Sequence, residues 1–247
     1  MNRVSLLVPC GLVTVLALMS LAIDAVAIRS SDNGVQSVRV ARCFQDTELN
    51  QSMATLKLQG GPEVTKVYES LVTSARTAPE CRTQVVQALI GSMERATDPT
   101  ANHFENYFLW QHAAGLLADL QATEALDLLI ANITFTDGLS ISFSHYPALL
   151  AILKIGEPAI PKLETALTTD PVPHRRSFEA FAIAYIGGAQ ARKALTHALS
   201  RETEPCVKNF LELSLQAFNN RARPNHISSE LNGKWLSAFY CQNHNSL

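Results

Sequence analysis

One short sequence pattern occurs twice in this 247-residue chain, and it limits the possible folds more than any other feature. Residues 151–156 read AILKIG and residues 182–187 read AIAYIG, so each copy ends with isoleucine and glycine. Glycine here is typical of a helix end, because it adopts the left-handed backbone conformation without steric cost. An apolar stripe with helical spacing follows each copy, at Ile160, Leu163 and Leu167 and then at Ala191, Leu195 and Leu199. The pattern therefore predicts two consecutive helix pairs, 31 residues apart.

The same period continues on both sides of these two pairs. Pro173 opens the first helix of one pair, and Pro205 opens another helix 32 residues later. Upstream, residues 110–120 and 123–133 form an earlier pair with helical apolar spacing. A more degenerate pair occupies residues 64–74 and 82–96.

Periods of this length, with two helices per unit, are typical of stacked α-solenoids, because one helix pair cannot bury its apolar face alone. The sequence therefore predicts an all-α fold, an α-solenoid of stacked antiparallel helix pairs with roughly four to five units. The solenoid is expected over residues 61–218 and is clearest over residues 103–218. Residues 28–60 are predicted to be a polar N-terminal segment, and residues 219–247 a C-terminal capping helix and tail.

Residues 170–199, with the sequence DPVPHRRSFEAFAIAYIGGAQARKALTHAL, resemble a HEAT repeat of the short kind also found in phycobilisome lyases. That family has an aspartate after one unit, an arginine early in the next first helix, and Ile-Gly before the second helix. These positions match Asp170, Arg175 or Arg176, and Ile186-Gly187. The resemblance implies a HEAT-like fold and says little about activity, because one fold supports many functions.

The N-terminus has the pattern of an export signal, predicted over residues 1–27. Arg3 precedes an uncharged run from Val4 to Ile23, and Ala25-Val26-Ala27 has the small residues that signal peptidase requires. Cleavage is predicted after Ala27, which gives a secreted or periplasmic protein with no membrane span. The alternative is an uncleaved membrane anchor, since the uncharged run is about as long as the ~20 residues that cross a bilayer.

The cysteine count agrees with export. Removal of Cys10 with the signal leaves four cysteines, an even number that is typical of disulfides in an oxidising compartment. Of the three possible pairings we favour Cys43–Cys81 and Cys206–Cys241, because each would link residues near one end of a linear fold. No two cysteines are close enough in sequence to form a zinc knuckle, so no metal site is expected.

One segment inside the repeats does not have helical periodicity. In residues 134–145, Leu139, Ile141 and Phe143 alternate with serines, which predicts either a short strand or an ordered loop. The simplest role for its apolar side chains is to cover the end of a helix pair. After the repeats, a capping helix is expected near residues 228–239.

Composition and motifs exclude several functional classes. The chain has 20 basic and 22 acidic side chains, a formal charge of −2, so no nucleic-acid-binding face is expected. It contains no Gly-x-Ser-x-Gly, no phosphate-binding glycine loop and no His-Glu-x-x-His. We therefore expect no catalytic residues, no cofactor and no metal.

The HEAT resemblance implies a binding face, because the second helices of such stacks line the concave side. The non-core residues of two predicted second helices would then contact a protein or peptide, namely Lys162, Thr165, Arg192, Lys193, Thr196 and His197. The predicted function is an exported, non-catalytic module for protein–protein interaction. The alternatives are an envelope structural or assembly factor, and a lyase-like enzyme or ligand carrier with a pocket lined by Tyr107, Trp110, Phe143 and Tyr146.

Overall fold

The computed structural model describes residues 43–96, 103–139 and 142–219. Across these ranges the chain forms ten α-helices and three short 3-10 helices, with no strand, so the all-α prediction is confirmed. None of the described helices combines the length and apolar character needed to cross a membrane. The predicted signal at residues 1–27 and the capping helix near 228–239 lie outside the described residues.

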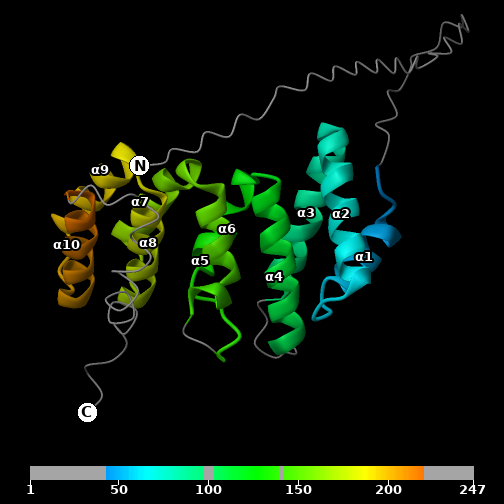
Figure 1. Ribbon diagram of the computed structural model, residues 1–247, viewed down its shortest axis with the longest axis horizontal. Helices are drawn as coiled ribbons and strands as arrows, with labels where there is room; N and C mark the ends of the chain where they lie inside the picture. The colour runs from blue at the N-terminus through cyan, green and yellow to red at the C-terminus, as the bar shows by residue number, and fades with distance from the viewer. Residues whose placement is uncertain (1–42, 97–102, 140–141, 220–247) are drawn as a thin grey trace, which may run out of the picture. The chain divides into compact units, whose positions relative to one another are not determined.

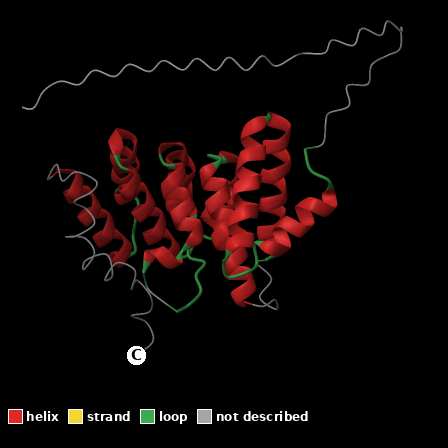
Figure 2. Ribbon diagram, turned by 45° about the vertical axis from the view of Figure 1, so that its right-hand side comes forward, coloured by secondary structure: helices red, strands yellow, loops and turns green. Residues whose placement is uncertain are grey.

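The helices follow one another along the chain, and a longer connection that includes η2 joins α5 to α6 (Figures 1 and 2). The α-helices are α1 Asp46–Thr55, α2 Pro62–Thr77, α3 Pro79–Arg95, α4 His103–Asp119, α5 Leu126–Ala131, α6 Pro147–Ile155, α7 Ile160–Thr169, α8 Pro173–Ile186, α9 Gly188–Leu199 and α10 Pro205–Asn219. The 3-10 helices are η1 Thr123–Ala125, η2 Phe143–His145 and η3 Glu157–Ala159.

Local sequence signals explain where many of these helices begin and end. Proline occupies the first turn of α2, α3, α6 and α8, where its missing N–H would have no helical partner in any case. Gly156 ends α6 with φ of 76°, and Gly187 ends α8 with φ of 77°. The two repeated Ile-Gly pairs therefore mark helix ends, as predicted.

Helices from successive predicted pairs pack against one another. In one series α4 contacts α6, α6 contacts α8, and α8 contacts α10, and Figure 1 shows these four helices in order. In a second series α5 contacts α7, and α7 contacts α9. The two series also contact each other, since α5 packs on α6, α7 on α8, and α9 on both α8 and α10.

The apolar stripes predicted from the repeat form part of one contiguous core. Ile160, Leu163, Ala191 and Leu195 are fully buried, and Leu167 is almost so. Leu199 is partly buried against the same core. Burial of each large apolar side chain contributes about 1.5–3 kcal/mol, so the stripes account for much of the packing between α7, α8 and α9.

The segment around residues 134–145 is a loop that ends in η2, so the strand alternative is wrong for the part that the structure describes. Asp137, which is buried, bends the segment: its Oδ1 accepts a hydrogen bond from Leu139 N at 2.9 Å, and its Oδ2 lies 2.6 Å from His145 Nδ1. Leu139 is 73% exposed, so it does not cover a helix end, whereas the Phe143 ring contacts Phe181. Residues 140–141 lie outside the described residues.

One predicted disulfide is confirmed. Cys43 and Cys81 are bonded across 38 residues of sequence, which links the segment before α1 to the start of α3. Cys206 is disulfide-bonded as well. Because Cys241 lies outside the described residues, its pairing with Cys206 stays a prediction.

Replacement of both Cys43 and Cys81 by serine is expected to lower the free energy of unfolding by roughly 3–4 kcal/mol. The bond closes a loop of 38 residues, and its loss frees that loop in the unfolded chain. Urea denaturation of the oxidised parent and the double variant measures the difference. Both proteins are kept oxidised, because reduction would also break the Cys206 disulfide. Equal midpoints for parent and variant would contradict the prediction.

Candidate functional site

All six residues predicted to contact a partner lie on the two neighbouring helices α7 and α9. Lys162 and Thr165 are on α7, and Arg192, Lys193, Thr196 and His197 are on α9. Lys162 is half-buried and the other five are exposed, because the core-facing positions of both helices are occupied by the apolar stripes. The structure therefore places the six side chains at the surface of α7 and α9.

Two of these residues contact carboxylate groups on the preceding helix of the series. Lys162 Nζ lies 2.6 Å from Asp127 Oδ2 on α5, and His197 Nδ1 lies 2.9 Å from Glu164 Oε1 on α7. The partners are 35 and 33 residues apart, close to the repeat period. Sequence reasoning missed both acidic partners, although opposite charges separated by one period are the signal that would have found them. Partly exposed pairs of this kind contribute only about 0–1 kcal/mol each.

A groove of about 420 Å³ runs beside α7, and only some of the six predicted residues line it. It is lined by α5, α7 and the first half of α8, and its lining includes Lys162 and Thr165. The four predicted residues of α9 are not part of this lining. The structure thus brings two of the six together around a groove and leaves four on the adjoining helix surface.

The groove also contains Glu179 of α8, which sequence reasoning missed because it stands between Phe178 and Ala180 in an apolar run. Its side chain is fully buried, and neither carboxyl oxygen has a hydrogen-bond partner among the described residues. Burial, reinforced by the nearby charge of Asp170 and opposed by Arg175 and Arg176, raises the pKa of Glu179 to about 8. At neutral pH the Glu179 carboxyl is therefore mostly protonated.

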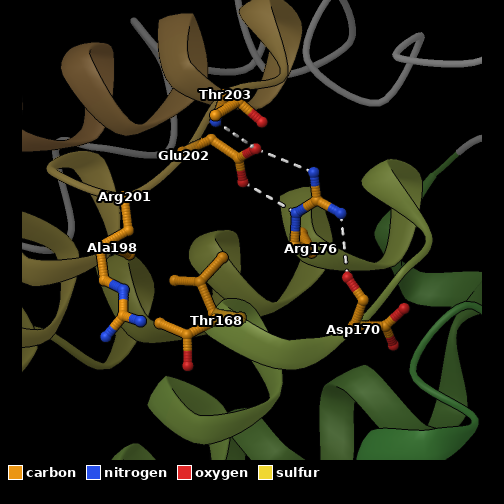
Figure 3. Close-up of a pocket in the computed structure, with 8 residues that line it drawn as sticks. Thr168, Asp170, Arg176, Ala198, Arg201, Glu202 and Thr203 are labelled. Carbon is orange, nitrogen blue, oxygen red and sulfur yellow. Dashed lines mark hydrogen bonds and ion pairs between the residues drawn. The ribbon is translucent and has the colours of Figure 1, made fainter.

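Asp170 and the two arginines that match the HEAT pattern lie together between α7 and α8. Arg175 Nε is 2.7 Å from Asp170 Oδ2, and Arg176 Nη1 donates to the Asp170 carbonyl oxygen at 2.9 Å. Arg176 also makes two hydrogen bonds of 2.8 Å to the Glu202 carboxylate, as Figure 3 shows. Asp170, Arg176 and Glu202 line a second cavity of about 200 Å³. Since the Arg176 and Glu202 charges are matched, we assign this cluster a structural role.

The four aromatic residues of the alternative ligand pocket pack against other rings. Tyr107 and Trp110 are buried, with ring centroids 6.5 and 5.0 Å from that of Phe135. Phe143 and Tyr146 contact rings of α8, at 6.3 Å from Phe181 and 4.9 Å from Phe178. These ring contacts give all four residues a packing role, Tyr107 and Trp110 against the loop after α5, and Phe143 and Tyr146 against α8.

Comparison with known proteins adds no function to these features. No model of a known protein family matches the sequence, and no curated protein is similar enough to it to be identified as a relative. Conclusions about function therefore follow from the surface of α7 and α9 and from the groove beside them.

Proposed function

We propose that this protein is an exported, non-catalytic α-solenoid of HEAT-like helix pairs that binds a protein or peptide partner on the face formed by α5, α7 and α9. The observation that carries the proposal is the arrangement of α7 and α9. One side of each helix packs into the core, and the other presents cationic and hydroxyl side chains next to a 420 Å³ groove. Such a surface has polar groups for specificity and a concavity for a protruding side chain.

Contacts between successive helices support the stacked arrangement. α5 packs on α7 with one ion pair, and α7 packs on α9 with one histidine–carboxylate contact, each between residues about one repeat apart. Stacking of equivalent helices is what makes the surface of a solenoid continuous from unit to unit. A partner that lies across α7 and α9 would therefore meet both sets of predicted residues.

The disulfides support export. The Cys43–Cys81 bond and the bonded state of Cys206 indicate an oxidising, extracytoplasmic location, because thiols are kept reduced in the cytosol of most organisms. Cleavage after Ala27 would leave residues 28–247, which include every residue that the structure describes. Secretion by this route is part of the proposal.

Affinity capture with residues 28–247, disulfides intact, from the extracytoplasmic fraction of the source organism tests the proposal. We expect one partner in stoichiometric amount, and we expect Arg192→Glu combined with Lys193→Glu to weaken its binding roughly tenfold or more, because charge reversal within an interface creates repulsion. The matched control is Lys66→Glu combined with Lys208→Glu, which makes the same change in net charge on α2 and α10, at two other exposed positions.

Unchanged binding by the α9 variant would show that the assigned face is wrong. An equal loss in the α9 variant and the control would show that overall charge, rather than this face, governs the association. Circular dichroism of each variant establishes that the helices remain folded.

A further inference from the structure

The groove beside α7 has one acidic side chain that forms no ion pair with the described residues. Lys162 is paired with Asp127 at 2.6 Å, and Arg175 is paired with Asp170 at 2.7 Å. Glu179 is the remaining charged residue of the lining, and it forms no ion pair or hydrogen bond with the described residues. The paired charges cancel, so an ionised Glu179 would give the groove a net negative charge.

A buried carboxyl group without a hydrogen-bond partner costs stability, and native proteins rarely contain one. Such groups gather at binding sites, where the ligand completes the interactions that the protein leaves open. Glu179 is fully buried at the groove, on a helix that packs against α6, α7, α9 and α10. Its position is therefore well defined before any ligand arrives.

The rest of the lining indicates what kind of ligand group would bind next to the Glu179 carboxyl. Apolar groups of Ile130, Ala131, Ala166 and Pro171 form part of the walls, and the hydroxyl-bearing Thr165 and Thr169 line the groove with them. Lysine and arginine side chains have an aliphatic stem that packs on apolar surface and a charged end that seeks a carboxylate. Arginine in addition can donate two parallel hydrogen bonds to the two oxygens of one carboxylate.

We propose that the groove formed by α5, α7 and α8 binds the cationic end of an arginine or lysine side chain, with Glu179 as its counter-ion. This assignment rests on the proposed function, because it takes the side chain from the protein partner that lies on the α7 and α9 face. The α9 residues would then contact the partner's surface while one basic side chain enters the groove.

Binding in this groove should depend on pH. The charged groups that act on Glu179 are Asp170, Arg175 and Arg176, and Asp127 and Lys162 line the same groove. Since the pKa of Glu179 is raised to about 8, a cation that binds at neutral pH must displace the carboxyl proton. Affinity should therefore fall about tenfold for each pH unit below 8, with release of one proton on binding, and level off above pH 8.

Isothermal titration calorimetry of residues 28–247 with the peptide acetyl-Gly-Arg-Gly-amide tests the assignment without the natural partner. We expect Glu179→Gln to weaken binding at least tenfold and to abolish both the pH dependence and the proton release. Thr165→Trp should also block binding, because Thr165 is an exposed residue of the groove lining. Its control is Thr168→Trp. Thr168 is an exposed residue of the same helix, and it lines the 200 Å³ cavity instead of the groove.

Three results would overturn the assignment. The first is equal binding of a peptide in which citrulline, which has no positive charge, replaces the arginine. The second is full binding by the folded Glu179→Gln variant. The third is binding of agmatine, a free alkylguanidinium, without binding of the peptide, which would make the ligand a small amine rather than a partner's side chain.

The outcome is independent of the partner capture described above. Peptide binding that depends on Glu179 supports the groove assignment even if reversal of Arg192 and Lys193 has no effect on capture. Conversely, capture that depends on α9, combined with no peptide binding, would leave the proposed function in place and remove the groove from it.

Discussion

Phe178→Ala is expected to lower the free energy of unfolding by about 3–5 kcal/mol, because it opens a cavity where several helices meet. The Phe178 ring is fully buried, and its centroid lies 4.9 Å from the rings of both Tyr146 and His174. Its helix, α8, packs against α6, α7, α9 and α10. The surrounding side chains therefore cannot collapse into the space without moving several helices at once.

Urea denaturation followed by circular dichroism measures this effect. Tyr185→Ala on the same helix is the control, because Tyr185 is 41% exposed and its loss is expected to change stability by less than about 1 kcal/mol. If Phe178→Ala and Tyr185→Ala were equally stable, the packing described around α8 would be incorrect.

Features that depend on neighbouring residues in sequence could be predicted well. The Ile-Gly pairs at Gly156 and Gly187 predicted helix ends, because a positive φ favours glycine and is a local property of the backbone. The stripe of Ile160 and Leu163 predicted a buried helix face, because helical spacing alone places these residues on one side. The helical class followed from these two signals.

The candidate site depends on contacts between helices, and most of it could not be predicted. Glu179 stands in an apolar run of α8, and its place in a groove depends on how α5 and α7 lie beside that helix. Similarly, the contact of Lys162 with Asp127 requires the packing of α5 on α7. Sequence periodicity selected six residues of α7 and α9, of which five are exposed and Lys162 is half-buried, but it did not predict a groove.

The N-terminal helix α1 is a further example of a missed feature. It falls within residues 28–60, which were predicted to be a polar segment, and among its residues only Met53 is buried. A helix with one buried side chain has little amphipathic pattern to detect. Its position next to α3 is helped by the Cys43–Cys81 disulfide, which is a tertiary contact.

Arg176→Met is expected to lower the free energy of unfolding by about 3–5 kcal/mol at neutral pH, because it leaves the Glu202 carboxylate buried without its cation. The exposed fractions of the Arg176 and Glu202 side chains are only 13% and 6%. Glu202 Oε1 also accepts hydrogen bonds from the backbone N–H groups of Thr203 and Glu204, which hold the carboxylate in place. The exposed fractions at the Lys162–Asp127 pair are 42% and 79%, so Lys162→Ala is the control, with an expected change of about 0–1 kcal/mol.

The effect of Arg176→Met should itself depend on pH. Burial alone would raise the pKa of Glu202, but the hydrogen bonds from Arg176 and from the backbone N–H groups hold it below its ordinary value. A carboxyl whose pKa is lowered in the folded state stabilises the protein above the pKa of the unfolded chain, and that contribution is lost as the pH falls through the folded value. Without Arg176 the folded pKa of Glu202 rises, so the variant loses this contribution.

Denaturation of parent and variant across a pH series below 7 tests this reasoning. The difference in unfolding free energy should be largest near neutral pH and should shrink as the pH falls below about 4, the range in which glutamate protonates in an unfolded chain. The double variant Arg176→Met with Glu202→Gln removes both charges and keeps an acceptor for the two N–H groups, so it should recover much of the lost stability at neutral pH. The loss of unfolding free energy in Arg176→Met could instead stay constant with pH and remain in the double variant. That result would mean that Arg176 stabilises α8 through its aliphatic packing and its bond to the Asp170 carbonyl, rather than through its charge.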